Sequence, residues 1–188
     1  MTESGGPFTN AVSLACHDLR TPLATIAGFA KTVIRAGELP EREARFVGMI
    51  DEAATQIGGL VDQLSLAARI AADRYAPVLA EADTLDLASS GEHGISAEGS
   101  GATIETDVEV MRRSLAALAI AALRHGELEG VAWMVDGREL TLGRVTASAA
   151  PVVEGSSPRD LGALVARMAI EQLGGSLSVE GELLRVRL

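Results

Sequence analysis

The chain has 188 residues and a formal net charge of −10 at pH 7, and 47% of it is apolar while only 3% is aromatic. This size allows one or two small domains whose core consists mainly of leucine, valine, isoleucine and alanine. An acidic chain without a basic stripe argues against a nucleic-acid-binding protein. Its apolar runs fall short of the ~20 residues that cross a membrane, and no signal segment begins the chain, so a cytoplasmic protein is expected. Cys16 is the only cysteine, which excludes an internal disulfide.

A first helix is expected from residue 9 to residue 36. Polar and small residues recur along one face at steps of three and four: Asn10, Ser13, His17, Thr21, Ala24, Gly28 and Lys31. A separate apolar stripe contains Ala15, Leu19, Ile26, Phe29 and Val33. His17 is therefore predicted to face outward, above a smooth patch of Ala24 and Gly28 that a helix of another protein can approach closely. Pro22 predicts a kink near His17, because proline removes a backbone donor and clashes with the carbonyl group four residues earlier.

The segment HDLRTPL, which begins at His17 and is followed by IAGF, resembles the H-box of bacterial two-component sensor histidine kinases. In that family the histidine accepts a phosphoryl group on a dimeric helical hairpin. The other interpretation is an ordinary amphipathic helix with a solvated histidine. The positions of His17, Thr21 and Pro22 at the offsets of the family motif favour the resemblance.

A second helix is expected from residue 41 to residue 72, after a turn of Gly37, Glu38, Leu39 and Pro40. Its apolar positions alternate steps of four and three, as in a coiled-coil seam: Phe46, Ile50, Ala53, Ile57, Leu60, Leu64, Ala67 and Ala71. One antiparallel hairpin cannot bury the stripes of both helices. Pairing of two copies into a four-helix bundle is therefore expected, which predicts a homodimer. The run LSLAARI also resembles the end of the second helix in the kinase family.

The second half of the chain is predicted to be α+β, with a small sheet covered by helices. Helices are expected at 85–88, 107–124 and 158–173, and loops at 89–101 and 146–157. Strands are expected at 77–79 and 102–105, in a hairpin around Asp136-Gly137, and as two closing strands around 180–182. The order of these elements resembles the ATP-binding domain of histidine kinases. The expected domains are a phosphoacceptor hairpin at 1–74 and a degenerate ATPase-like domain at 75–188.

The resemblance implies nucleotide-binding boxes that this sequence does not carry. Where the family has two asparagines for Mg²⁺ and phosphates, the chain has Ala117 and Ala121, and a methyl group cannot coordinate a hard cation. The D-x-G-x-G box is missing, and the lid is reduced to about a dozen residues, 147–158. Asp160 places a negative charge where a helix N-terminus would meet phosphates. The chain is therefore more similar to the dimeric histidine phosphotransferases of phosphorelays, and no cofactor or metal of its own is expected.

The leading hypothesis is a phosphoryl relay in which His17 passes a phosphoryl group between the aspartates of two receiver domains. The resemblance implies that Asp18 holds the imidazole, through a kink or from the partner subunit. It also implies that Arg20 offsets phosphoryl charge and that Thr21 orients a water molecule toward a phospho-aspartate. Simple alternatives remain open, which are surface ion pairing for Asp18 and Arg20 and a local backbone bond for Thr21. Mg²⁺ is expected to come with the receiver.

Response regulator receiver domains, a second copy of the chain and an upstream histidine kinase are the expected partners. Two other functions remain open at this point. One is a sensor histidine kinase and phosphatase with a divergent ATP site. The other is a non-catalytic pseudokinase that binds kinases or response regulators.

Overall fold

The computed structural model describes residues 6–37 and 39–188, and the chain divides into two compact units, Met1–Arg74 and Tyr75–Leu188. The first unit is helical, and the second contains both helices and strands. No helix in the described part of the chain is long and apolar enough to cross a membrane.

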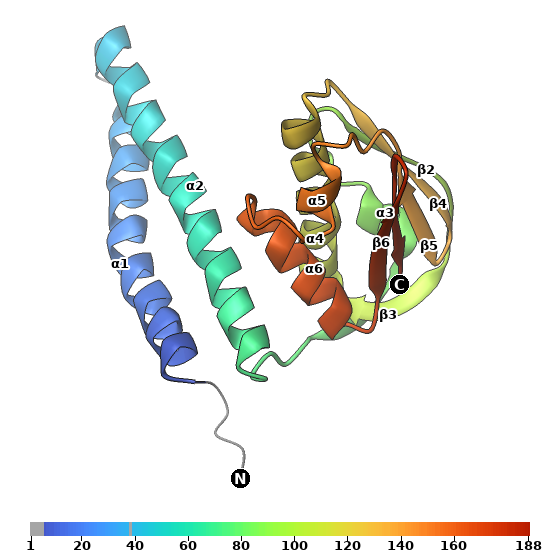
Figure 1. The fold of residues 1–188 in the computed structure, drawn as a ribbon. Helices are drawn as coiled ribbons and strands as arrows, with labels where there is room; N and C mark the ends of the chain where they lie inside the picture. The colour runs from blue at the N-terminus through green and yellow to red at the C-terminus, as the bar shows by residue number, and fades with distance from the viewer. Residues whose placement is uncertain (1–5, 38) are drawn as a thin grey trace. The chain divides into compact units, whose positions relative to one another are not determined.

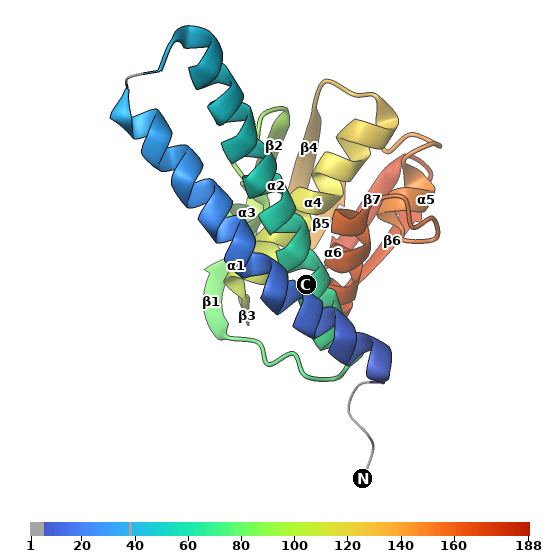
Figure 2. The same cartoon turned by 90° about the vertical axis from the view of Figure 1, so that its left-hand side faces the viewer.

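The first unit is an antiparallel hairpin of two long helices, α1 (Pro7–Ala36) and α2 (Glu41–Ala71), which lie side by side (Figures 1 and 2). Both predicted helices are confirmed to within two residues at each end. Helix α1 ends at Gly37, whose φ of 69° is the left-handed conformation that glycine adopts without strain. Glu38, which belongs to the predicted turn, lies outside the described residues.

Small side chains form the contact between α1 and α2. The buried residues of helices α1 and α2 are Cys16, Ala30, Ala54, Val61 and Ala68. The larger apolar side chains of the predicted stripes are instead between 39 and 69% exposed in the single chain: Leu19, Ile26, Phe29, Phe46, Ile50, Ile57, Leu60 and Leu64. We call these eight residues the apolar seam. Contiguous exposed apolar surface of this kind is typical of an interaction site.

The second unit contains a five-stranded sheet in the order β2-β4-β5-β7-β6 and a two-stranded sheet of β1 and β3. The pairs β4–β5, β5–β7, β6–β7 and β1–β3 are antiparallel, and only β2 and β4 are parallel. The strands are β1 (Leu79–Asp83), β2 (Ile95–Gly101), β3 (Thr103–Asp107), β4 (Val131–Gly137), β5 (Glu139–Leu142), β6 (Ser176–Glu180) and β7 (Leu183–Arg187). The helices are α3 (Thr84–Ala88), α4 (Val108–Gly126), α5 (Ala150–Val153) and α6 (Leu161–Gln172). Helices α4, α5 and α6 cover one face of the five-stranded sheet (Figure 1).

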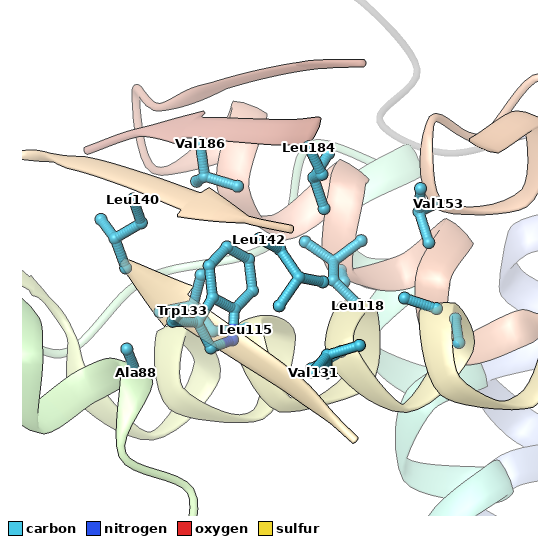
Figure 3. Close-up of a cluster of buried hydrophobic side chains, with 14 of the residues drawn as sticks. Ala88, Leu115, Leu118, Val131, Trp133, Leu140, Leu142, Val153, Leu184 and Val186 are labelled. Carbon is cyan, nitrogen blue, oxygen red and sulfur yellow. The ribbon is translucent and has the colours of Figure 1, made fainter. Parts of the chain in front are cut away.

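The core lies between this sheet and helix α4 (Figure 3). Alternate residues of the strands point into it, including Trp133 of β4, Leu142 of β5 and Leu184 of β7, all fully buried. Leu115 and Leu118 of α4 meet them from the other side. The predicted α+β architecture is therefore confirmed, and so is the prediction that Trp133 is a core residue.

Several predicted boundaries in this unit are wrong. The segment 89–101, predicted as a loop, contains β2, because its glycines allow close pairing with β4; a Cβ atom at Gly99 would collide with the carbonyl oxygen of Val135. The strand expected at 77–79 begins only at Leu79. The loop expected at 146–157 contains α5, and the last long helix begins at Leu161 rather than at residue 158 because Asp160 caps it.

The residues on each side of the boundary between the units form hydrogen bonds within their own unit. The backbone N–H of Arg74 donates to the carbonyl oxygen of Arg69 at 2.8 Å, so Arg74 is part of the hairpin. In the second unit, Tyr75 donates its hydroxyl proton to Asp107 at 2.7 Å, and the same carboxylate oxygen accepts the N–H of Val78 at 3.2 Å. Asp107 also caps α4, so the start of the second unit is anchored to its longest helix.

Candidate functional site

His17 lies on α1 with 79% of its side chain exposed, as predicted for the polar face of that helix. Its Nδ1 atom is 3.1 Å from Oδ1 of Asp18. An ionised carboxylate only accepts hydrogen bonds, so this contact requires a proton on Nδ1. In the neutral imidazole the lone pair of Nε2 is then free for bonding. The pair therefore presents a nucleophilic nitrogen to solvent.

The contact between His17 and Asp18 differs from the expectation that Asp18 needs a kink or the partner subunit to reach the imidazole. Helix α1 continues through Pro22 as one helix, and the contact forms within one chain. Both side chains are exposed, so neither is prevented by packing from turning toward the other. Nδ1 is also the ring nitrogen nearer to the backbone, which brings it within reach of a neighbouring residue.

Arg20 reaches across the hairpin to Asp62 of α2. Its Nε and Nη2 atoms lie 3.1 and 2.9 Å from the same Oδ1 atom, and both side chains are about half exposed, at 48 and 50%. Sequence reasoning singled out Arg20 but not Asp62. Asp51 and Asp62 are eleven residues apart, about three helical turns, which puts both on one face of α2. This spacing does not say which residue of α1 either carboxylate meets.

The polar face of α1 continues on both sides of His17. Thr21 is exposed one turn later, and Ala24 and Gly28 follow as an exposed patch; a Cβ atom at Gly28 would meet no neighbouring atom. Lys31, at the far end, lies 3.9 Å from Asp51. The structure thus places all four predicted site residues, His17, Asp18, Arg20 and Thr21, within about one turn of α1.

One turn before His17, the hydroxyl of Ser13 accepts a hydrogen bond from Nη2 of Arg74 at 3.4 Å. The guanidinium of the last hairpin residue therefore lies on the same face as His17. Sequence reasoning did not identify Arg74, because its neighbour on α1 depends on how the two helices align.

In the second unit, the positions that hold asparagines in the kinase family are apolar. Ala121 is fully buried and Ala117 is partly buried, and both pack in the hydrophobic cluster around α4. Neither side chain offers an oxygen atom to a cation. Within the described ranges, no group of three or more histidine, cysteine, aspartate or glutamate side chains is arranged to hold a metal ion.

The N-terminus of α6 is occupied by the carboxylate of Asp160, whose side chain is only 7% exposed. Its Oδ1 accepts the N–H of Ala163 at 3.1 Å, and its Oδ2 lies 3.0 Å from Nη1 of Arg124 and 3.4 Å from Nε2 of His125. An anion bound at this helix end would need the same N–H groups and the same cations. The protein's own carboxylate therefore occupies this helix N-terminus.

The segment 147–158, which stands where the kinase family has an ATP lid, packs against the core. Ala149, Val152 and Val153 are buried, and Ser148 donates to the carbonyl oxygen of His125 at 2.8 Å. Arg167 of α6 donates to the carbonyl oxygen of Glu154 and holds the end of this segment. Together with Ala117, Ala121 and Asp160, this packing does not fit ATP with Mg²⁺.

Residues 9–73 match the family model of the His Kinase A (phospho-acceptor) domain. No curated protein matches the chain in sequence. Among solved structures, full-length ShkA in complex with AMPPNP has a TM-score of 0.66 at 21% identity, over 94% of this chain and 44% of ShkA, so this chain spans less than half of ShkA. The Acinetobacter baumannii histidine kinase AdeS has a TM-score of 0.55 at 17% identity, over 92% of this chain and 96% of AdeS. The hairpin therefore matches the His Kinase A phospho-acceptor domain, and the chain has the fold of these histidine kinases.

Proposed function

We propose that the chain is a histidine phosphotransferase of a two-component phosphorelay, which carries a phosphoryl group on His17 without binding ATP. One combination of features supports this function. An exposed histidine is held by Asp18 on a phospho-acceptor hairpin, while the adjoining unit has alanines at the nucleotide positions and a carboxylate at the N-terminus of α6.

The transfer step follows from the geometry of His17 and Asp18. Nε2 attacks the phosphorus of a receiver's acyl phosphate. An N–P bond forms and the P–O bond to the receiver's aspartate breaks, and that carboxylate leaves with the electron pair. The ring gains positive charge, which the Asp18 carboxylate stabilises through the proton on Nδ1. The reverse step passes the group to a second receiver, and such transfer depends mainly on positioning and charge neutralisation.

The receiver docks on the polar face of α1. Ala24 and Gly28 leave room for close approach of a helix below His17. Thr21, one turn from His17, orients a water molecule toward the receiver's phospho-aspartate in this proposal. Mg²⁺ comes with the receiver, where it neutralises charge on the phosphoryl group during transfer.

The apolar seam brings two copies of the hairpin together as a four-helix bundle. Burial of such side chains stabilises association by about 25 cal/mol for each Å² of apolar surface removed from water. His17 stays exposed in this arrangement, because the polar face and the apolar stripe of α1 are separate in the sequence pattern.

A histidine kinase with a divergent ATP site is the second candidate, and the comparisons favour it in architecture. The hairpin matches the His Kinase A model, and the similarity to AdeS extends over nearly the whole length of both chains. A complete kinase core would give both results. The ShkA structure with AMPPNP shows that a chain of related fold contains this nucleotide analogue. The contacts of Asp160 and the burial of Ala121 are the observations against this candidate.

Two labelling reactions separate the candidates. Wild type, His17→Ala and His93→Ala are incubated either with γ-labelled ATP and Mg²⁺ or with receiver domains labelled from acetyl phosphate. His93 is an exposed histidine of the second unit and serves as the matched control. Acid-labile label acquired from a receiver, but not from ATP, by wild type and His93→Ala supports the phosphotransferase. Label acquired from ATP at His17 would establish a kinase instead.

A further inference from the structure

We infer that Asp62 is a positioning residue of the phosphoryl site, which holds the Arg20 guanidinium and competes for it with the phosphoryl group on His17. This inference rests on the proposed function. Asp62 belongs to the second helix, outside the H-box motif, and it acts through Arg20 rather than by contact with the reacting atoms.

Arg20 has Asp62 as its acceptor in the structure, and it belongs to the helix that carries His17. Residues three apart on a helix are neighbours on its surface, so Arg20 lies within one turn of His17. Two of its nitrogen atoms bond one carboxylate oxygen of Asp62, at 2.9 and 3.1 Å. The guanidinium is thus already bonded to Asp62 before any phosphoryl group arrives, so a phosphoryl group on His17 has to draw donors away from that carboxylate.

Competition for the Arg20 guanidinium changes the free energy of phospho-His17, because the phosphoryl group is strongly charged. A phosphoryl group adds about −1.5 to −2 charges and three acceptor oxygens. Once His17 carries that group, Arg20 divides its donors between the phosphoryl oxygens and Asp62. Asp62 also adds a negative charge near the site. Both effects raise the free energy of phospho-His17, so they favour onward transfer to a receiver.

A simpler interpretation is that Arg20 and Asp62 form a cross-helix ion pair that only stabilises the hairpin. The chain contains a matched example of such a pair, between Lys31 and Asp51. Both pairs join α1 to α2, and Arg20 and Lys31 are eleven residues apart, or about 16 Å along the helix. Asp51→Asn therefore removes a similar charge at a distance from His17 that weakens its effect there.

A receiver domain is first labelled from acetyl phosphate in the presence of Mg²⁺ and then mixed with this protein. The experiment measures the ratio of label on His17 to label on the receiver at equilibrium. The proteins are wild type, Asp62→Asn, Asp51→Asn, Arg20→Gln and the double variant Arg20→Gln with Asp62→Asn. In Asp62→Asn we expect a shift toward phospho-His17 of about two- to fivefold, the range of an exposed ion pair. Asp51→Asn should divide the label as wild type does. In the Arg20→Gln background, the effect of Asp62→Asn should shrink to the small through-space contribution of its charge.

Thermal unfolding of the same variants shows whether stability explains the result, because a purely structural role would lower the melting temperature without moving the equilibrium. If wild type transfers label but Asp62→Asn divides it as Asp51→Asn does, the inference about Asp62 is wrong and the proposed function stands. An undiminished effect of Asp62→Asn in the Arg20→Gln background also contradicts the inference. If wild type accepts no label, both fail.

Discussion

The Nδ1 atom of His17 lies 3.1 Å from Oδ1 of Asp18, the residue that follows it in the same helix. This contact favours a proton on Nδ1, and in the neutral imidazole it leaves Nε2 unprotonated, as the proposed transfer requires. Because both side chains are exposed, the effect of Asp18 is on orientation and charge rather than on stability.

Asp18→Asn should keep the hydrogen bond, since an amide oxygen also accepts, but it removes the negative charge opposite the ring. We expect phosphoryl acceptance from a labelled receiver to slow roughly tenfold, because a charge-assisted hydrogen bond is about twice as strong as a neutral one. Asp18→Ala should be slower still, since the tautomer preference is also lost. Rapid-quench measurement of labelled His17 tests this, and equal rates in all three proteins would show that Asp18 does not act on the imidazole.

Ile57→Glu should weaken association of the hairpins. It places a charge within the apolar seam, where a buried, unpaired carboxylate is strongly unfavourable. Sedimentation at equilibrium should show a dimer for wild type and mainly monomer for Ile57→Glu. Gln56→Glu adds the same charge at the neighbouring exposed position, outside the seam, and should remain dimeric. A monomeric wild type would exclude the four-helix bundle.

Asp160→Ala should lower the free energy of unfolding of the second unit by about 1–2 kcal/mol, the value of a lost helix N-cap. The substitution also leaves Arg124 and His125 without their shared partner at the N-terminus of α6. Asparagine is a good N-cap residue, so Asp160→Asn should cost less than half as much. Urea unfolding followed by the fluorescence of the single tryptophan, Trp133, measures both. Equal stability of wild type and Asp160→Ala would show that the cap contributes nothing.

Trp133→Ala should destabilise the second unit by about 3–5 kcal/mol, because it opens a cavity beneath the five-stranded sheet. Trp133→Phe should cost less than half of that. The indole Nε1 has no hydrogen-bond partner among the described residues, so phenylalanine removes an unsatisfied donor as well as some volume. Circular dichroism of thermal unfolding measures both, and a smaller loss for alanine than for phenylalanine would contradict this packing.

Much of the hairpin could be predicted because its sequence patterns involve residues that are close together along the chain. The step of three and four residues locates both helices, and the motif from His17 to Leu23 locates the proposed phosphoacceptor. The contact of Arg20 with Asp62 could not be derived in the same way. It depends on how α1 and α2 align along their lengths, and the pattern of each helix alone does not contain that alignment.

In the second unit, the predictions that are wrong concern segments whose structure depends on contacts with distant parts of the chain. The glycines of Ile95–Gly101 indicate a loop by local propensity, yet the segment forms β2 because β4 supplies hydrogen bonds along its whole length. Asp160 was correctly expected at a helix N-terminus. Its contacts with Arg124 and His125 required the packing of α4 against α6, which no local pattern specifies.

The junction at Arg74 and Tyr75 has a consequence for engineering. The Arg74 amide and guanidinium are bound within the hairpin, and the Tyr75 hydroxyl is bound within the second unit, so one peptide bond joins two separately anchored residues. A chimaera cut between them would keep these hydrogen bonds in both halves, and a cut even three residues later would take Tyr75 away from Asp107. A flexible glycine-serine spacer inserted at this bond would lengthen the tether while leaving each half intact. A change in phosphoryl transfer at His17 after this insertion would show that the second unit acts on His17 through the short connection, and an unchanged rate would show that it does not.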